Sequence, residues 1–297
     1  MSIITRTKDR PVLLSRALES IAAQDFDDWE VLIVNDGGDP AAVARCVAAL
    51  TDEQRARVRQ FDNPAPTGRW PAANQGVREA TGEYLILHDD DDRWSPAFLS
   101  RAVAYLDADP ERDGVVARTT IIWERPAGEG YETFATEQFV PESVAPLLMD
   151  QMRFNHFVPI AFLYRRRLHD EIGLYDDRHP VVADWQFNTK VLLRGPLEYL
   201  DDEPLVFWHQ RPSAQGTAGN SVIAESDAHA RFDALLRDEA FRRLVDADGS
   251  GMALYFERRL AELERSIVSR LESRHLLYRA ARAVVLRFRA LRGTARR

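Results

Sequence analysis

Four consecutive aspartates, 89–92, are the residues of this sequence best suited to metal chemistry. They follow the apolar run 84–87, which has the composition of a buried strand, and precede a Trp-Ser-Pro sequence typical of a helix start capped by Ser95. Adjacent carboxylates repel one another when they leave bulk water together, so this arrangement predicts a bound cation. Oxygen ligands favour Mg²⁺ or Mn²⁺, which keep open positions for substrate phosphates. An acidic run alone is also compatible with a solvated turn, but its flanks favour a metal and diphosphate site.

Two more polar segments, 5–10 and 35–39, directly follow short apolar runs rich in β-branched residues. The second contains Asp36 followed by two glycines. Such an Asp can accept hydrogen bonds from a base or a ribose while the glycines allow a tight turn, although the same residues are typical of an ordinary turn.

Strand and helix patterns alternate along the first third of the chain. The predicted strands are 3–5, 31–34, 58–61 and 84–87, and the predicted helices are 12–22, 41–50 and 72–80. This order predicts an α/β fold with a doubly wound parallel sheet. Because such sheets bind ligands at the carboxyl ends of their strands, the three polar segments are expected to line one crevice.

Taken together, these motifs resemble the family 2 glycosyltransferases, from Ile3 to about Arg211. The segments that carry the resemblance are 3–10, 18–24, 29–38, 68, 74–76, 80–84 and the acidic cluster. The resemblance implies a GT-A fold over 1–225, with a nucleotide-sugar-binding half at 1–110 and an acceptor-binding half at 111–225. A helical extension over 226–297, with a basic amphipathic end, is expected to follow.

The resemblance also implies roles for individual residues. The residues expected to bind the nucleotide sugar are Thr5, Thr7, Arg10, Asp36, Arg69, Asn74, Asp89, Asp90, Asp91 and Arg211. Within this set Asp36 is expected on the base, Asp90 near the ribose, and Asp91 on the metal with Asp89 in support. Arginine matches diphosphate geometry, which favours Arg10 and Arg69 as its partners. Many relatives carry Arg immediately before the residue equivalent to Asn74, where this chain has Ala73; Arg69 is a candidate to supply that charge.

The second half of the sequence is expected to supply the acceptor side. Asp184 matches the family's carboxylate at a helix start, which would serve as the general base of an inverting transfer. It is also a plain candidate for an N-cap. His209 follows the strand-like run 205–208 and is predicted to be a metal ligand, a donor to the diphosphate shared with Arg211, or an ordinary buried polar residue. Trp185 and Trp208 are able to stack on sugars, although core packing is the commoner role of Trp.

Composition and charge limit the remaining possibilities. The single cysteine, Cys46, excludes a disulfide framework, and the absence of a leader or of a long apolar run predicts a cytoplasmic protein. The net charge is −8, but residues 274–297 carry +8, which leaves −16 on 1–273. So acidic a body argues against nucleic-acid binding. The basic amphipathic tail is expected to lie on an anionic membrane surface, dock on the body or contact a second copy in a homodimer.

The sequence therefore predicts an inverting, metal-dependent hexosyltransferase that uses Mn²⁺ or Mg²⁺. Its donor is expected to be a nucleoside-diphosphate sugar, with UDP-sugar favoured, and its acceptor a glycan or a lipid-linked glycan. One alternative is a nucleotidyltransferase that makes nucleotide sugars, but 5–10 lacks the glycine-rich phosphate loop such enzymes carry. The other is a catalytically silent binding module of the same fold.

Overall fold

The computed structural model describes residues 1–128, 130–214, 216, 219–220, 226–251 and 254–270. The chain divides into two compact units, the first over Met1–Asp233 and the second from Ala234 onward. Every residue of the predicted site lies in the first unit.

The main sheet of the first unit has six strands in the order β3-β2-β1-β4-β9-β6. Their bounds are β1 Ser2–Thr7, β2 Glu30–Asp36, β3 Val58–Asn63, β4 Tyr84–Leu87, β6 Gly114–Val116 and β9 Phe162–Arg165. The first four strands of that order are parallel, whereas β9 runs antiparallel to both β4 and β6. The predicted strands are confirmed. Because β1, β2 and β4 are apolar and buried almost throughout, only their ends carry polar side chains toward solvent.

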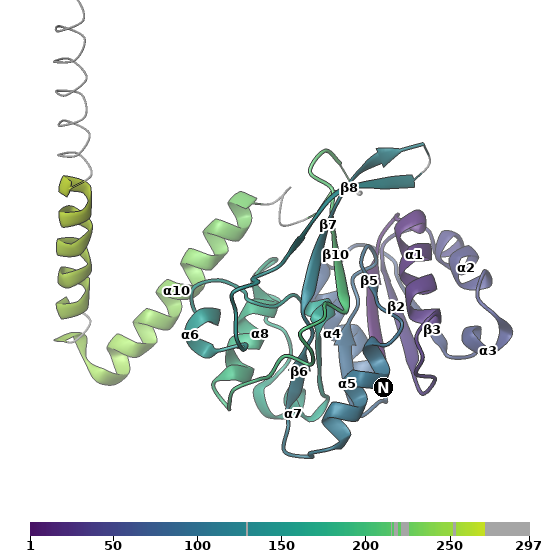
Figure 1. Ribbon diagram of the computed structural model, residues 1–297, viewed down its shortest axis with the longest axis horizontal. Coiled ribbons are helices and arrows are strands. Elements are labelled where there is room, and N and C mark those ends of the chain that lie inside the picture. The colour runs from purple at the N-terminus through teal and green to yellow at the C-terminus, as the bar shows by residue number, and fades with distance from the viewer. Residues whose placement is uncertain (129, 215, 217–218, 221–225, 252–253, 271–297) are drawn as a thin grey trace, which may run out of the picture. The chain divides into compact units, whose positions relative to one another are not determined.

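Helices connect the parallel strands (Figure 1). They are α1 Pro11–Ala22, α2 Pro40–Ala48, α3 Asp52–Arg55, α4 Arg69–Glu79 and α5 Phe98–Asp107. Proline opens α1 and α2, where its missing N–H has no cost, and the Asp39 side chain caps α2. The predicted helix start at Ser95 is wrong: α5 begins at Phe98 with Ala97 at its N-cap, because Arg93–Trp94 forms strand β5 and Ser95 bonds through its backbone to Leu205.

A second sheet has the order β5-β10-β7-β8. It comprises β5, β7 Thr119–Ala127, β8 Gly130–Gln138 and β10 Val206–Gln210. The β7–β8 hairpin extends beyond the main sheet (Figure 1). A register shift between Trp123 and Glu124 interrupts this hairpin, and such bulges re-aim the side chains that follow them.

The predicted acceptor half adds short elements to the first unit. These are α6 Leu148–Gln151, the 3₁₀ turn Pro159–Ala161, α7 Arg167–Ile172 and α8 Ala183–Leu192. Ring contacts join Tyr164, His169, Tyr175 and Phe187 into a buried aromatic cluster between α7, α8 and β9. This cluster fixes the start of α8, which carries Asp184.

The contact between α4 and the sheet leaves no room for a side chain at Gly76. A Cβ at Gly76 would lie 2.4 Å from Cγ2 of Ile4. We expect Gly76→Ala to lower the free energy of unfolding by roughly 1–3 kcal/mol, as overpacking of a core does. Urea denaturation measures this change. Gly195→Ala is the control, because a Cβ there meets nothing within 4 Å and should leave stability nearly unchanged.

The C-terminal region contains α10 Ser226–Asp248 and a helical stretch over 254–270. From Ala234 onward it exposes several large apolar side chains, among them Phe256, Leu260, Leu263 and Ile267. Among the described residues no helix is long and apolar enough to cross a membrane. The predicted basic tail, 274–297, lies outside the described residues, so its membrane or homodimer role stays a prediction, which salt-dependent vesicle binding and the mass in solution would test.

Candidate active site

A cavity of about 770 Å³ lies at the carboxyl ends of β1, β2 and β4. It is also bordered by the starts of α4 and α8 and by β10. Of the predicted site residues, those that line it are Thr7, Arg10, Asp36, Arg69, Asp89, Asp90, Asp91 and Asp184. The strand ends therefore bring the three polar segments and Asp184 to one cavity.

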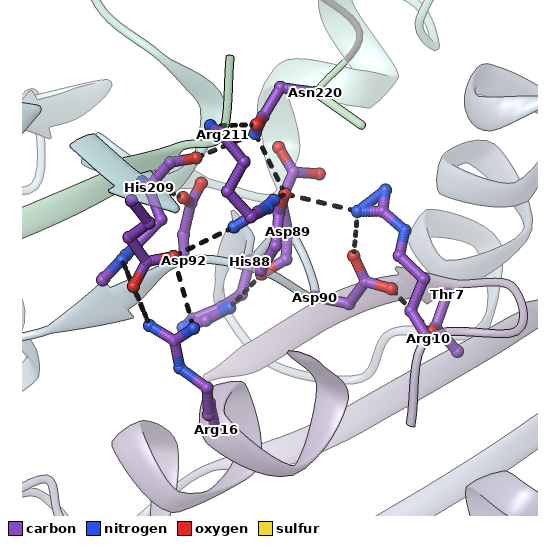
Figure 2. Close-up of polar contacts among 12 residues, drawn as sticks. Thr7, Arg10, Arg16, His88, Asp89, Asp90, Asp92, His209, Arg211 and Asn220 are labelled. Atoms are coloured by element: carbon purple, nitrogen blue, oxygen red, sulfur yellow. Dashed lines mark hydrogen bonds and ion pairs between the residues drawn. The ribbon is translucent and has the colours of Figure 1, made fainter. Parts of the chain in front are cut away.

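The first two carboxylates of the acidic cluster are each matched by groups from the end of β1 or from the segment after it. Arg6 pairs with Asp89, and although burial raises the pKa of that carboxyl, Arg6 outweighs burial and the pKa is lowered. Thr7 Oγ1 donates to Asp90 at 2.6 Å, and Arg10 lies 3.1 Å from Asp90 (Figure 2). Burial dominates there and raises the pKa of Asp90 to about 6.

Asp91 has one engaged and one open carboxylate oxygen. Its Oδ2 accepts from Arg10 at 3.2 Å, from Asn220 at 3.2 Å and from the fully buried Arg211. Within the described part of the chain, its Oδ1 accepts no hydrogen bond. Because Mg²⁺ and Mn²⁺ are commonly held by one or two carboxylates together with phosphates and water, Asp91 fits such a cation. The described residues hold no group of three His, Cys, Asp or Glu side chains that would cage one.

Asp92, the fourth aspartate, and His88, which directly precedes Asp89, are the remaining buried residues of this segment. Asp92 accepts the backbone N–H of His209 at 2.7 Å, and burial beside Asp91 raises the pKa of Asp92 well above its usual range. Burial lowers the pKa of His88 to about 4, so its ring is neutral near pH 7 and adds no charge.

His209 lies within β10, and its ring is turned away from the acidic cluster. Side chains alternate along a strand, so Trp208 and Gln210 line the cavity while the His209 ring meets Glu124 at 2.9 Å. The structure does not bring His209 together with Asp89 and Asp91 as a set of metal ligands. Its assignment to the metal stays a prediction that this arrangement does not favour.

The Asp36 carboxylate binds its own chain at the edge of the cavity. It accepts hydrogen bonds from Asn63, from the backbone and hydroxyl of Thr67, and from the backbone of Gly68, at 2.7–3.0 Å. Burial raises the pKa of Asp36, but these bonds outweigh it and leave the pKa lowered. Asp36 therefore fixes the turn that leads into α4, and its contact with a base stays a prediction.

Four of the predicted residues, Thr5, Asn74, His209 and Arg211, lie outside the lining of the cavity. Thr5 is completely buried in β1, and its hydroxyl has no hydrogen-bond partner among the described residues. The Asn74 amide exchanges two hydrogen bonds with the backbone of Tyr175, at 2.8 and 3.0 Å. Asn74 thus joins α4 to the segment before α8, a structural task that orients Arg69 and Asp184 indirectly.

Asp184 is the second residue of α8, and the N-cap is Val182. The alternative interpretation of Asp184 as an N-cap is therefore wrong. Its carboxylate accepts from Asn155 Nδ2 at 2.8 Å, while Asn155 is held in turn by Gln151 and Asn188. Burial raises the pKa of Asp184, opposed by the Trp185 backbone N–H and by Arg6. A fixed carboxylate with a raised pKa, open to the cavity, is suited to accept a proton.

The sequence of this chain is similar to sequences of known proteins. A sequence model of glycosyl transferase family 2 matches residues 2–173. The chain belongs to this family. Its relative YwdF of Bacillus subtilis (strain 168), an uncharacterized glycosyltransferase, is 31% identical over 188 residues, which cover 63% of this chain and 66% of YwdF. The match thus spans just under two thirds of that relative.

Solved structures agree with the family 2 assignment at the level of the fold. TarS of S. aureus in complex with UDP-GlcNAc aligns with a TM-score of 0.56 and 18% identity, over 74% of this chain and 60% of TarS. The mannosyltransferase PcManGT from Pyrobaculum calidifontis, in complex with GDP-Man and Mn²⁺, aligns with a TM-score of 0.52 and 20% identity, over 88% of this chain and 79% of PcManGT. The predicted GT-A fold is confirmed.

Sequence reasoning gave no individual role to five side chains that contact the predicted site residues or their partners. They are Arg6, Arg16, Glu124, Asn155 and Asn220. Arg6 was visible as a charge at a buried strand end, and its position beside Thr7 was the available signal. The others lie far in sequence from the residues that they contact, and no local pattern marks them.

Proposed function

We propose that the chain is an inverting, divalent-cation-dependent glycosyltransferase. It transfers a hexosyl group from a nucleoside-diphosphate sugar, with UDP-sugar favoured, to a glycan or lipid-linked glycan. The observation that carries this proposal is that the Asp89–Asp91 cluster and Asp184 line one cavity, with Arg6 paired to Asp89 and acting electrostatically on Asp184. A site for an anionic leaving group and a base thus share one space.

The donor end of the cavity is built for a diphosphate. Arg10 and Arg69 line it, and Arg211 reaches it through Asp91. Guanidinium groups bind phosphate oxygens in a fixed geometry, so they would neutralise the charge that develops on the departing diphosphate. The open Oδ1 of Asp91 would hold the cation, which supplies further neutralisation when bound. The Mn²⁺ in the PcManGT complex supports this assignment, as UDP-GlcNAc in the TarS complex supports a UDP donor.

The acceptor end is built around Asp184. An acceptor hydroxyl that hydrogen-bonds to this carboxylate gives up its proton as it attacks the anomeric carbon from the face opposite the leaving group. Configuration inverts in this single displacement. Phe154, Trp185 and Trp208 line the cavity and offer apolar faces on which a sugar ring of the acceptor would stack.

Release of nucleotide tests the proposed function directly. We expect one member of a panel of UDP-, GDP- and dTDP-sugars to be hydrolysed slowly with Mn²⁺ present, and EDTA to stop the reaction. Liquid chromatography of the released nucleoside diphosphate measures this. Release of pyrophosphate from a sugar phosphate and a nucleoside triphosphate would instead establish the nucleotidyltransferase, and no binding of any nucleotide would favour the silent module.

A further inference from the structure

Arg16, His209 and Arg211 belong to a buried ion network (Figure 2). Its centre is Glu124 of β7, which is 2% exposed. Glu124 contacts Arg16 at 2.6 Å, His209 Nδ1 at 2.9 Å and Arg211 Nη1 at 3.4 Å. This carboxylate of β7 therefore contacts side chains from α1, from β10 and from the residue that follows β10.

Glu124 faces inward beside an irregularity in the pairing of β7 with β8. From Thr119 the buried and less buried residues alternate, which on its own would turn Trp123 inward and Glu124 outward. The alternation changes beside the register shift, whose extra residue is Phe134 of β8, and Glu124 is buried while Trp123 is only partly buried. Bulges next to active sites commonly re-aim a side chain in this way.

Arg211 is shared between two carboxylates. One nitrogen of its guanidinium, Nη2, pairs with Asp91, and the other, Nη1, contacts Glu124. Glu124 does not need Arg211 for neutrality, because Arg16 already binds it through both guanidinium nitrogens, at 2.6 and 3.3 Å. The Tyr131 ring lies 5.8 Å from the Arg16 guanidinium and 5.4 Å from that of Arg211, which confines both groups further.

We propose that Glu124 is a positioning residue that keeps Arg211 at the site when Arg211 changes partner from Asp91 to the donor diphosphate. This inference rests on the proposed function. A completely buried guanidinium that gives up Asp91 needs a second carboxylate close by, because an uncompensated buried charge is strongly unfavourable. Glu124 supplies the second partner, so Nη1 stays in place while Nη2 turns to a phosphate oxygen. In the same network His209 donates to Glu124 and thereby orients it.

Substitution of Glu124 by Gln tests the proposal. Without the charge of Glu124, Arg211 depends more strongly on its ion pair with Asp91, and that pair then competes with both the cation and the diphosphate. We expect the dissociation constant of the nucleoside diphosphate with Mn²⁺ to rise 10- to 100-fold, as changes behind a metal ligand commonly cause. Calorimetric titration of UDP, GDP and dTDP, each with Mn²⁺, measures this, using whichever binds the intact protein most tightly. The Mn²⁺ concentration for half-maximal activity should rise as well.

The matched control is Glu30→Gln. Glu30 is the first residue of β2, whereas the cavity lies at the other end of this strand, beside Asp36. Glu30 is also a partly buried carboxylate in a hydrogen-bonded network, with Ser2, Thr81 and Arg59, and it lies away from the cavity. We expect its replacement to lower stability without changing nucleotide or Mn²⁺ binding. If Glu124→Gln does not fold, Glu124→Asp keeps the charge but has a side chain one methylene shorter, which lengthens the contact with Arg211, and it should give a smaller loss of binding.

A double-variant cycle with Arg211→Lys decides between positioning and general stabilisation. If Glu124 acts through Arg211, the two losses of binding should be clearly non-additive. Unchanged diphosphate and Mn²⁺ binding in Glu124→Gln, additive losses, or an equal loss in Glu30→Gln would overturn the proposal. If the intact protein binds no nucleoside diphosphate, the proposed function itself fails, which is a separate result.

Discussion

Replacement of Asp91 by Asn is expected to reduce sugar transfer at least about 100-fold, which corresponds to roughly 3 kcal/mol of transition-state stabilisation. The substitution removes the charge whose open oxygen would hold the cation, while it keeps the size of the side chain and its contact with Asn220. Mn²⁺ dependence should be lost or shifted to much higher concentrations. Initial rates over a series of Mn²⁺ concentrations, with the donor identified in the panel, measure both effects.

Stability separates this loss from unfolding. Arg10 and Arg211 keep Asp90 and Glu124 as partners when Asp91 becomes neutral, so the melting temperature should change little. Asp91→Ala removes these contacts too, and should lose more stability for a similar loss of activity. Asp113→Asn is the control, because Asp113 pairs with Arg167 and Arg194 outside the cavity and should affect stability alone. Undiminished turnover with unchanged Mn²⁺ dependence in Asp91→Asn would remove Asp91 from the metal site.

The sequence predicted the four parallel strands of the main sheet and the position of the cavity because both depend on local patterns, whereas β6 and the antiparallel β9 were not predicted. Runs of apolar β-branched residues form β1, β2 and β4, and polar residues follow them directly. Parallel strands then bring those polar residues to one edge, whatever their separation in sequence. Patterns of this kind do not say which motif residue touches the cavity. Thr5 and Asn74 belong to the motifs, yet one is buried in a strand and the other joins two segments of backbone.

Sequence patterns did not reveal the buried network around Glu124, for physical reasons. Glu124 faces inward where the alternation of β7 changes, beside an extra residue in β8, and no residue type in either segment signals this irregularity. Arg16 belongs to α1 and reaches Glu124 across 108 positions of sequence. His209 has the residue type of a metal ligand, but the register of β10 turns it toward Glu124. Interactions of this kind depend on tertiary packing, which spacing along one chain does not record.

Asp184→Asn is expected to lower kcat by about 10²- to 10⁴-fold, the usual contribution of a general base. Donor binding should stay close to that of the intact enzyme, because Asp184 lies at the acceptor end and Asn keeps the size of the side chain and an oxygen to accept from Asn155. Single-turnover rates and calorimetric titration of the donor with Mn²⁺ measure the two effects independently. Equal losses of donor affinity and of rate would instead point to a structural role.

The raised pKa of Asp184 adds two further expectations. Because burial disfavours the ionised carboxylate, activity of the intact enzyme should decline on acidification at a higher pH than a free aspartate would give, and Asp184→Asn should lose this dependence. A folded-state pKa above the unfolded value means that ionisation destabilises the fold at neutral pH, so the neutral Asn variant should melt at the same temperature or higher. Loss of catalysis with undiminished thermal stability is the outcome that a base predicts, and a clear drop in melting temperature would contradict it.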